Sequence, residues 1–128
     1  MAQMVKRTSY DAPEKDVLLN PVNAHEIGVQ VSNSGVSETD RDGNKIIKAG
    51  TPVGGVVSAL ETRNTVLTVS DDENAQGVLR HDVVFRNGAT TENATLIVMG
   101  VIDTSKCPTI SAEAKTAMKH IVFQNGGM

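Results

Sequence analysis

The chain contains only three aromatic residues, and this scarcity constrains its fold more than any other feature of the sequence. Tyr10, Phe85 and Phe123 are the only rings among 128 residues. Its core must therefore be built mostly from Val, Ile, Leu, Ala and Met, which carry less apolar area than aromatic rings. Such a core is thin. We expect a small sheet with thin layers rather than a large fold built around a cavity.

The length is that of one domain, and it is sufficient to bury a core without a metal or a disulfide. Cys107 is the only cysteine, so the chain has no intramolecular disulfide and its fold is compatible with a reducing cytoplasm. Cys107 directly precedes Pro108 in a predicted loop, with no His or Asn close in sequence. We interpret it as a bystander thiol rather than a nucleophile.

The charge balance argues against a nucleic-acid partner. The formal net charge is −3, and the 12 Lys and Arg residues are scattered, with Lys6-Arg7 as the only tight pair. The first 16 residues are polar and carry no secretory signal, and no apolar run is long enough to span a bilayer. We expect a soluble protein made in the cytoplasm, with neither nucleic acid nor membrane as a partner.

Apolar residues at a period of two predict several short strands separated by turns. Asp42-Gly43 and Asn87-Gly88 are tight-turn signals, and Gly54-Gly55 indicates a bulge. In residues 93–102 both faces are apolar, with Leu96, Val98 and Ile102 on one face and Ile97, Met99 and Val101 on the other, which predicts a central, fully covered strand. The predicted strands cover residues 27–31, 45–48, 53–60, 65–69, 76–85 and 93–102.

One helix is predicted near the C-terminus. Ser111 is a good N-cap, and Ala114, Ala117, Met118 and Ile121 form one apolar stripe at helical spacing. Residues 120–123 are β-formers and are expected to leave the helix as a final strand. The fold class is therefore mainly β (α+β), a small β-barrel or sandwich-like domain with one C-terminal helix.

The domain is expected to span residues 25–128. Residues 1–24 are polar, are interrupted by Pro13 and Pro21, and have one apolar cluster, Val17-Leu18-Leu19. They are expected to form an extended N-terminal arm that orders against a partner.

Catalytic and metal sites are not expected, and neither is a cofactor, so the chain is not predicted to be an enzyme. The histidines are His25, His81 and His120. His81 and Asp82 are adjacent on an expected strand, where neighbours point to opposite faces and cannot form one relay. The acidic run 71–73 lacks the alternating pattern of a calcium loop and is interpreted as a solvated turn.

Four segments in order carry a resemblance to a known family. Residues 47–56 read IKAGTPVGGV and residues 75–83 read AQGVLRHDV. Residues 94–103 read ATLIVMGVID, and residues 114–123 read AKTAMKHIVF. Together they resemble the head decoration proteins of tailed bacteriophages, the lambda-type family. Met118 stands where that family often has Leu, and the first 44 residues lie outside the resemblance.

The resemblance implies a protein of the virion without catalytic activity. Decoration proteins bind the outer surface of the expanded head and cement the major capsid protein against the pressure of the packaged DNA. Lambda-type members do so as homotrimers, with the N-terminal arm lying on the capsid. By this resemblance the capsid-contact candidates lie in the arm, with Tyr10 as the anchor; they are Met4, Val5, Lys6, Arg7, Thr8 and Tyr10.

Two other functions remain open. A head–tail or tail-tube component would also be small, β-rich and without a catalytic site, but it would assemble into rings or tubes. A small-molecule binding module would require a deep pocket lined by His25, His81 or His120.

Overall fold

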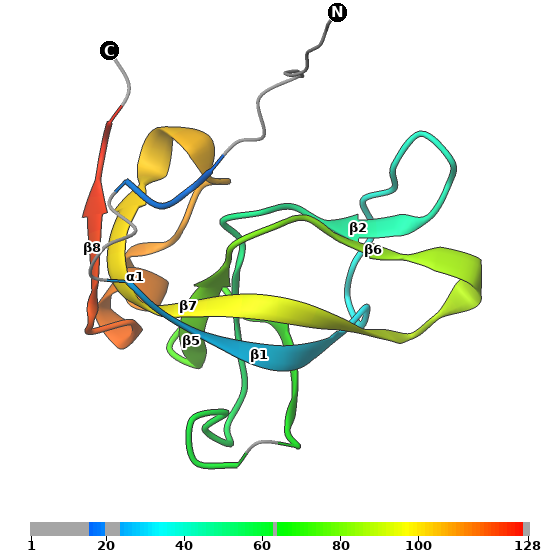
Figure 1. Ribbon diagram of the computed structural model, residues 1–128, viewed down its shortest axis with the longest axis horizontal. Helices are drawn as coiled ribbons and strands as arrows, with labels where there is room; N and C mark the ends of the chain where they lie inside the picture. The colour runs from blue at the N-terminus through cyan, green and yellow to red at the C-terminus, as the bar shows by residue number, and fades with distance from the viewer. Residues whose placement is uncertain (1–15, 20–23, 63, 127–128) are drawn as a thin grey trace, which may run out of the picture.

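The computed structural model describes residues 16–19, 24–62 and 64–126. Their fold is mainly β, with a small closed barrel of five strands and one short C-terminal α-helix, as predicted (Figure 1). The strands are β1 (His25–Ser32), β2 (Lys45–Ile47), β3 (Pro52–Gly54), β4 (Val66–Val69), β5 (Ala75–Leu79), β6 (Val83–Phe85), β7 (Thr91–Asp103) and β8 (Ile121–Gln124). The helix α1 spans Ala112–Ala117, and short 3₁₀ turns lie at Arg86–Gly88 and Thr104–Lys106.

The barrel runs in the order β1-β4-β3-β5-β7 and closes because β7 also pairs with β1. The pair β1–β4 is parallel, and the other four pairs are antiparallel. Beyond the barrel, β8 pairs in parallel with the last residues of β7. β2 and β6 form a separate two-stranded antiparallel sheet. These pairings join segments far apart in the sequence into one body.

The core consists of two apolar clusters that share strands β5 and β7. On β7, Leu96 and Val98 belong to one cluster, whereas Ile97 belongs to the other. The first cluster joins residues 17 and 18 to α1 and β8. It contains Val17, Leu18, Ala49, Ala75, Val78, Ile97, Ile102, Ile110, Ala114, Met118 and Ile121. The second combines β1 with β2, β4 and β6, and it contains Val29, Val31, Ile47, Val53, Ala59, Leu67, Leu79, Val83, Phe85, Leu96 and Val98.

The predicted alternation along β7 is wrong beyond Val98. Ile102 packs in the cluster of Ile97 rather than in that of Leu96. The reason is Gly100, whose φ of 146° departs from regular strand geometry. Met99 is 45% exposed, so the strand is not fully covered on both faces.

The predicted strand at residues 53–60 is also too long, because β3 ends at Gly54. The bulge predicted there is present as a shift of register between Val53 and Gly54. After it, the carbonyl oxygens of Gly55 and Val57 accept hydrogen bonds from the side chain of Gln76 instead of from a neighbouring strand. Residues 55–62 are therefore a loop.

The predicted strand at residues 76–85 divides into β5 and β6. Between them the backbone N–H of Arg80 donates to Thr95, and the Asp82 carboxylate accepts from the N–H of Ala49. These bonds end the ladder of β5 and direct β6 to β2. The predicted turn at Asn87-Gly88 is confirmed, with positive φ at both residues.

The helix begins as predicted. The Ser111 hydroxyl oxygen accepts a hydrogen bond from the N–H of Ala114 at 3.1 Å. The helix ends at Ala117, and β8 follows it, as expected from the β-forming residues there. Ala114, Met118 and Ile121 of the predicted stripe are buried together.

The part of the predicted arm that the structure describes begins at Asp16 and packs against the body. Val17 and Leu18 are buried in the first cluster. The N–H of Leu19 donates to Val101, and the carbonyl of Val17 accepts from the N–H of Asp103. This segment runs antiparallel to the end of β7, so the body includes residues that the sequence pattern placed in the arm.

Candidate interaction surface

The loop at residues 55–62 presents apolar side chains to solvent. Val56 is 89% exposed and Leu60 56%, and Val57 is also exposed. We call these three residues the loop patch. Single exposed apolar residues are common on protein surfaces, but a group of them on one loop is typical of an interaction site.

Gln76 on β5 fixes the conformation of this loop. Its side-chain oxygen accepts from the N–H of Ala59 at 2.9 Å. Its side-chain nitrogen donates to the carbonyls of Gly55 and Val57, at 3.0 and 2.7 Å. Both donors and the acceptor of the amide are used within one loop. The loop patch is therefore held in place before any partner arrives, which reduces the entropy cost of binding.

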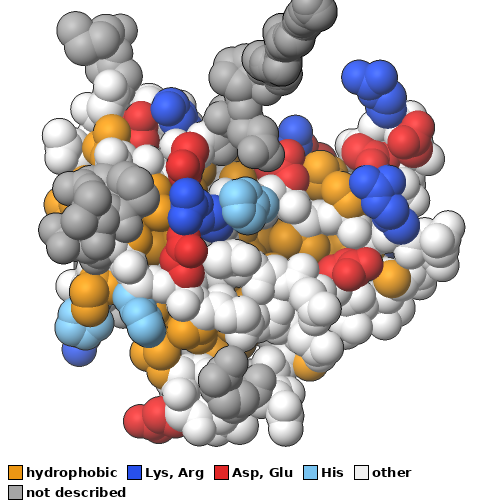
Figure 2. All heavy atoms as spheres, in the orientation of Figure 1, with side chains coloured by type: hydrophobic (Ala, Val, Ile, Leu, Met, Phe, Trp, Pro, Cys, Tyr) orange, Lys and Arg blue, Asp and Glu red, His pale blue; other side chains and the backbone are white. Residues whose placement is uncertain are grey.

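A cavity of about 290 Å³ lies between the loop and the end of α1. Its walls are mostly apolar and include Ile27, Leu60 and Met118. Lys119 and His120 line the same cavity. Figure 2 shows apolar side chains gathered at the lower left of the molecule, in the region of α1 and the 55–62 loop, with histidine close to them. We call this hollow the basic cavity.

A second, shallower hollow adjoins the first, and the two share Ser58, Ala75 and Gln76. This hollow is lined by Val56, Glu73 and Asn74 in addition. We call it the acidic hollow. The two adjoining hollows are therefore lined by apolar side chains together with the carboxylate of Glu73 and the ammonium group of Lys119.

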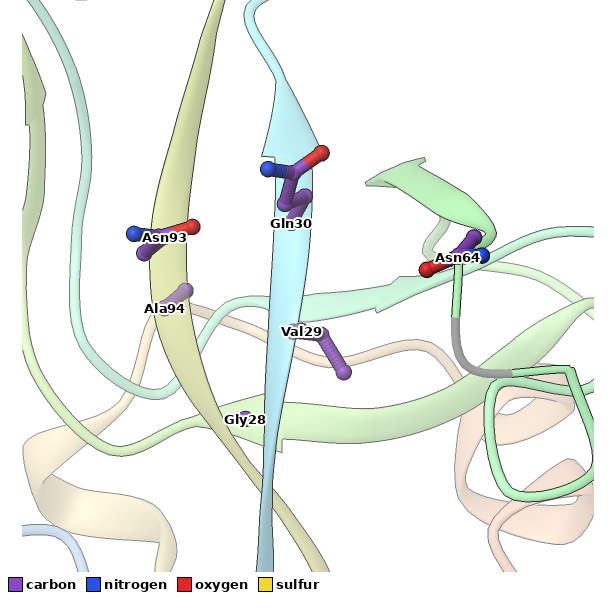
Figure 3. A pocket seen from close by; sticks show the side chains of 6 residues that line it. All are labelled: Gly28, Val29, Gln30, Asn64, Asn93 and Ala94. Carbon is purple, nitrogen blue, oxygen red and sulfur yellow. The ribbon is translucent and has the colours of Figure 1, made fainter.

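A third hollow, on the outside of β1 and β7, is polar (Figure 3). Gln30 and Asn93 are direct cross-strand neighbours there, and Asn64 faces them from the loop before β4. Gly28 contributes no side chain, which leaves the hollow open. Its amides offer hydrogen-bond donors and acceptors without a formal charge.

Arg80 marks the place where residue 16 meets the barrel. Its guanidinium forms ion pairs with Glu26 of β1 and, at 3.0 Å, with Asp16. The hydrogen bond to Glu26, followed by that to Asp16, raises the pKa of Arg80 above its ordinary value. These ion pairs fix the start of the described chain against β1. The capsid-contact candidates Met4, Val5, Lys6, Arg7, Thr8 and Tyr10 lie outside the described residues.

The other residues considered in the sequence do not converge on one site. Of the three histidines, only His120 lines the basic cavity. The Asp71 carboxylate accepts from the N–H of Ser111 at 2.7 Å, and Asp72 accepts from the N–H of Asn74 at 2.8 Å. The Asp72 carboxylate thus stabilises the acidic turn itself, and the Asp71 carboxylate joins this turn to the start of α1.

The described chain has neither a cluster of metal-ligating side chains nor a membrane-spanning helix. Within residues 16–19, 24–62 and 64–126, no three His, Cys, Asp or Glu side chains are grouped so that they could hold a metal ion. The helices of this part are also too short and too polar to cross a bilayer.

The loop patch is not among the features predicted from the sequence. Val56 and Val57 follow Val53 in a β-forming run, so their pattern predicts a continuing strand. The signal that could have revealed the loop is the Gly54-Gly55 pair. The hydrogen bonds that hold the loop, however, come from Gln76, about twenty residues away.

No protein-family model matches the sequence, and comparison with the curated proteins also gives no match.

Proposed function

We propose that the protein is a capsid decoration protein, which binds the outer surface of the expanded phage head and stabilises it against internal pressure. Its partner in this proposal is the major capsid protein, on which it acts as a homotrimer and without catalysis. In this proposal its location is the exterior of the virion.

One observation carries the proposal. The four segments that resemble the lambda-type family contain β3 and β5 and most of β7 and β8. In the sheet these four strands are consecutive neighbours. A series of short motifs that is scattered along 77 residues in sequence thus belongs to one packed unit (residues 47–123). Residues that pack together constrain one another. A resemblance in all four segments therefore supports the family more strongly than a resemblance in one segment does.

The remaining surface is compatible with binding rather than with chemistry. The loop patch is apolar and fixed, and Asp16, with which the described chain begins, is paired with Arg80 of the barrel. Both are features through which a clamp could engage another protein.

Cosedimentation with phage heads tests the proposal. Purified protein is mixed with expanded and with unexpanded heads, and the bound fraction is measured after pelleting. We expect saturable binding to the expanded heads only, because a cementing protein recognises the mature lattice. Absence of binding to both forms, or assembly of the free protein into rings or tubes, would contradict the proposal.

Deletion of residues 1–15 tests the role of the arm. The deletion retains Asp16 and its ion pair with Arg80, and it retains the buried Val17 and Leu18. We expect the shortened protein to keep its circular dichroism spectrum and unfolding midpoint but to lose occupancy on expanded heads. Full occupancy by the shortened protein would place the capsid contacts on the body instead.

A further inference from the structure

We propose that the basic cavity binds a small amphiphilic anion, in which a carboxylate is joined to a short apolar chain. This site is separate from the proposed function, because its occupation requires neither a capsid nor a second copy of the chain. Three properties of the cavity carry the inference: its apolar floor, the cationic groups at its rim and the rigidity of its walls.

The floor of the basic cavity belongs to the apolar core. Leu96, Val98 and Met118 line the cavity, and all three side chains are buried. Ile27 of β1 and the exposed Leu60 of the 55–62 loop add further apolar walls. An apolar chain that enters the cavity therefore exchanges water for contact with hydrocarbon on several sides, which favours binding.

The volume of the cavity limits the size of the ligand. The cavity holds about 290 Å³, which is close to the lower end of the range of about 300–1,000 Å³ for small-molecule sites. Such a space accepts a short acyl chain but not a long lipid.

The charged groups at the cavity are cationic. Lys119 and His120 line it and are both exposed, which places them at its rim. Among the described residues no Asp or Glu lines this cavity, and Glu73 lines only the acidic hollow. Lys119 forms no ion pair within the described chain. A carboxylate at the rim would therefore meet an ammonium group without a competing anion, and the imidazole of His120 can donate a second hydrogen bond.

Both walls of the cavity are fixed by hydrogen bonds. On one side, the side chain of Gln76 holds the 55–62 loop. On the other side, the turn at residues 119–120 is closed by a bond of 3.3 Å from the N–H of Ile121 to the carbonyl of Met118. Met118 and Ile121 are buried in the first core cluster, so the turn is anchored at both ends. A site that is formed before its ligand arrives has a smaller entropy cost of binding.

Titration of the full-length protein with sodium octanoate tests the site. The methyl NMR signals of Ile27, Leu60 and Met118 report on the cavity, and those of Val66 and Val122 report on exposed apolar positions outside it. We expect saturable shifts of the cavity signals only, with a dissociation constant at or below about 1 mM. Octylammonium has the same chain and the opposite charge, so it should bind about tenfold more weakly or worse.

Two variants separate the charged part of the site from the apolar part, with circular dichroism as the check on folding. Lys119→Gln should weaken octanoate binding about fivefold to tenfold and leave the binding of 1-octanol unchanged, because only the anion uses the ammonium group. Leu60→Ser should weaken the binding of both ligands, because it removes an apolar wall. Lys45→Gln, on the exposed start of β2, is the matched control and should bind octanoate like the wild type.

Three results would overturn the inference. The first is the absence of saturable shifts at the cavity signals up to about 10 mM octanoate. The second is equal shifts at Val66 and Val122, which would show adsorption to exposed apolar side chains instead of a site. The third is equal binding of octanoate and octylammonium, or unchanged octanoate binding by Lys119→Gln, which would show that the cavity does not select an anion.

Discussion

At the scale of single residues, Gly77 occupies a position that has no room for a side chain. A Cβ at Gly77 would stand 2.4 Å from the carbonyl oxygen of Ile97 and 2.9 Å from the Cγ of Leu96. The first of these is backbone of the paired strand β7, which cannot rotate away. We expect Gly77→Ala to lower the free energy of unfolding by about 1–3 kcal/mol, measured by urea denaturation.

Gly28 on β1 is the matched control for this prediction. A Cβ there meets no atom within 4 Å. Gly28→Ala should therefore change the free energy of unfolding by less than about 0.5 kcal/mol. Equal effects at the two positions would show that backbone entropy, and not the close approach of β5 to β7, determines the result.

The carboxylate of Asp103 makes the free energy of unfolding depend on pH in the acid range. Its carboxylate accepts from the Ser105 hydroxyl at 2.6 Å and from the N–H of Gly126 at 2.9 Å, and these bonds, the Ser105 hydroxyl first, lower its pKa below the ordinary value of 3.8. A lowered pKa in the folded state stabilises the protein above pH 3.8, and this stabilisation is lost as the pH falls through the folded pKa.

Ser105→Ala removes the largest cause of the lowered pKa. We expect the pKa of Asp103, followed by carbon-13 NMR of its carboxyl group, to move up toward 3.8 in this variant. Because the unfolded-state pKa is unchanged, the variant should lose less stability on acidification than the wild type, and the loss should be complete at a higher pH. An unchanged Asp103 titration would mean that Gly126 and the backbone alone hold the carboxylate.

At the scale of elements, the Ser111 cap decides whether α1 forms, because a helix of six residues has little stability of its own. The Ser111 hydroxyl both accepts from Ala114 and donates to the carbonyl of Asp71. We expect Ser111→Ala to lower the free energy of unfolding by about 1 kcal/mol, measured by urea denaturation. Ser111→Thr retains a hydroxyl and should cost less; an equal cost would assign the effect to packing.

Elements with a local cause were predictable from the sequence, and those with a distant cause were not. The alternation of Ile27, Val29 and Val31 was sufficient for β1, and Ser111 was sufficient for the start of α1. By contrast, the end of β3 depends on Gln76, and the separation of β5 from β6 depends on bonds to Thr95 and Ala49. No local pattern reports hydrogen bonds made across the fold.

At the scale of the whole molecule, the two clusters should unfold together. Leu79 and Ile97 are fully buried in different clusters, yet their strands β5 and β7 are paired. We expect Leu79→Ala and Ile97→Ala each to cost about 2–5 kcal/mol and to retain a single transition. Methyl NMR signals from each cluster, followed through urea denaturation, provide the measurement. Unfolding midpoints that differ between the two clusters would contradict a single transition.

The candidate site was predictable only in its general nature. A thin apolar core with few rings did indicate a small sheet, and the closed barrel agrees. The arm residues named from the resemblance lie before residue 16 and stay a prediction. The loop patch and the two hollows beside it required the three-dimensional fold, because Val56, Glu73 and Lys119 come from three separate parts of the chain.

Closure of β1 onto β7 has a consequence for how the protein behaves in concentrated solution. It leaves β8, of four residues, as the outer strand of the six-stranded sheet. Unpaired strand edges are the templates on which folded proteins aggregate irreversibly through their backbones. The strands of the separate two-stranded sheet, β2 and β6, are three residues each. With edges this short in the described chain, we expect contacts between native chains to be made largely by side chains. Such contacts dissolve again when ionic strength or pH changes, so crowding should yield reversible clusters rather than fibres.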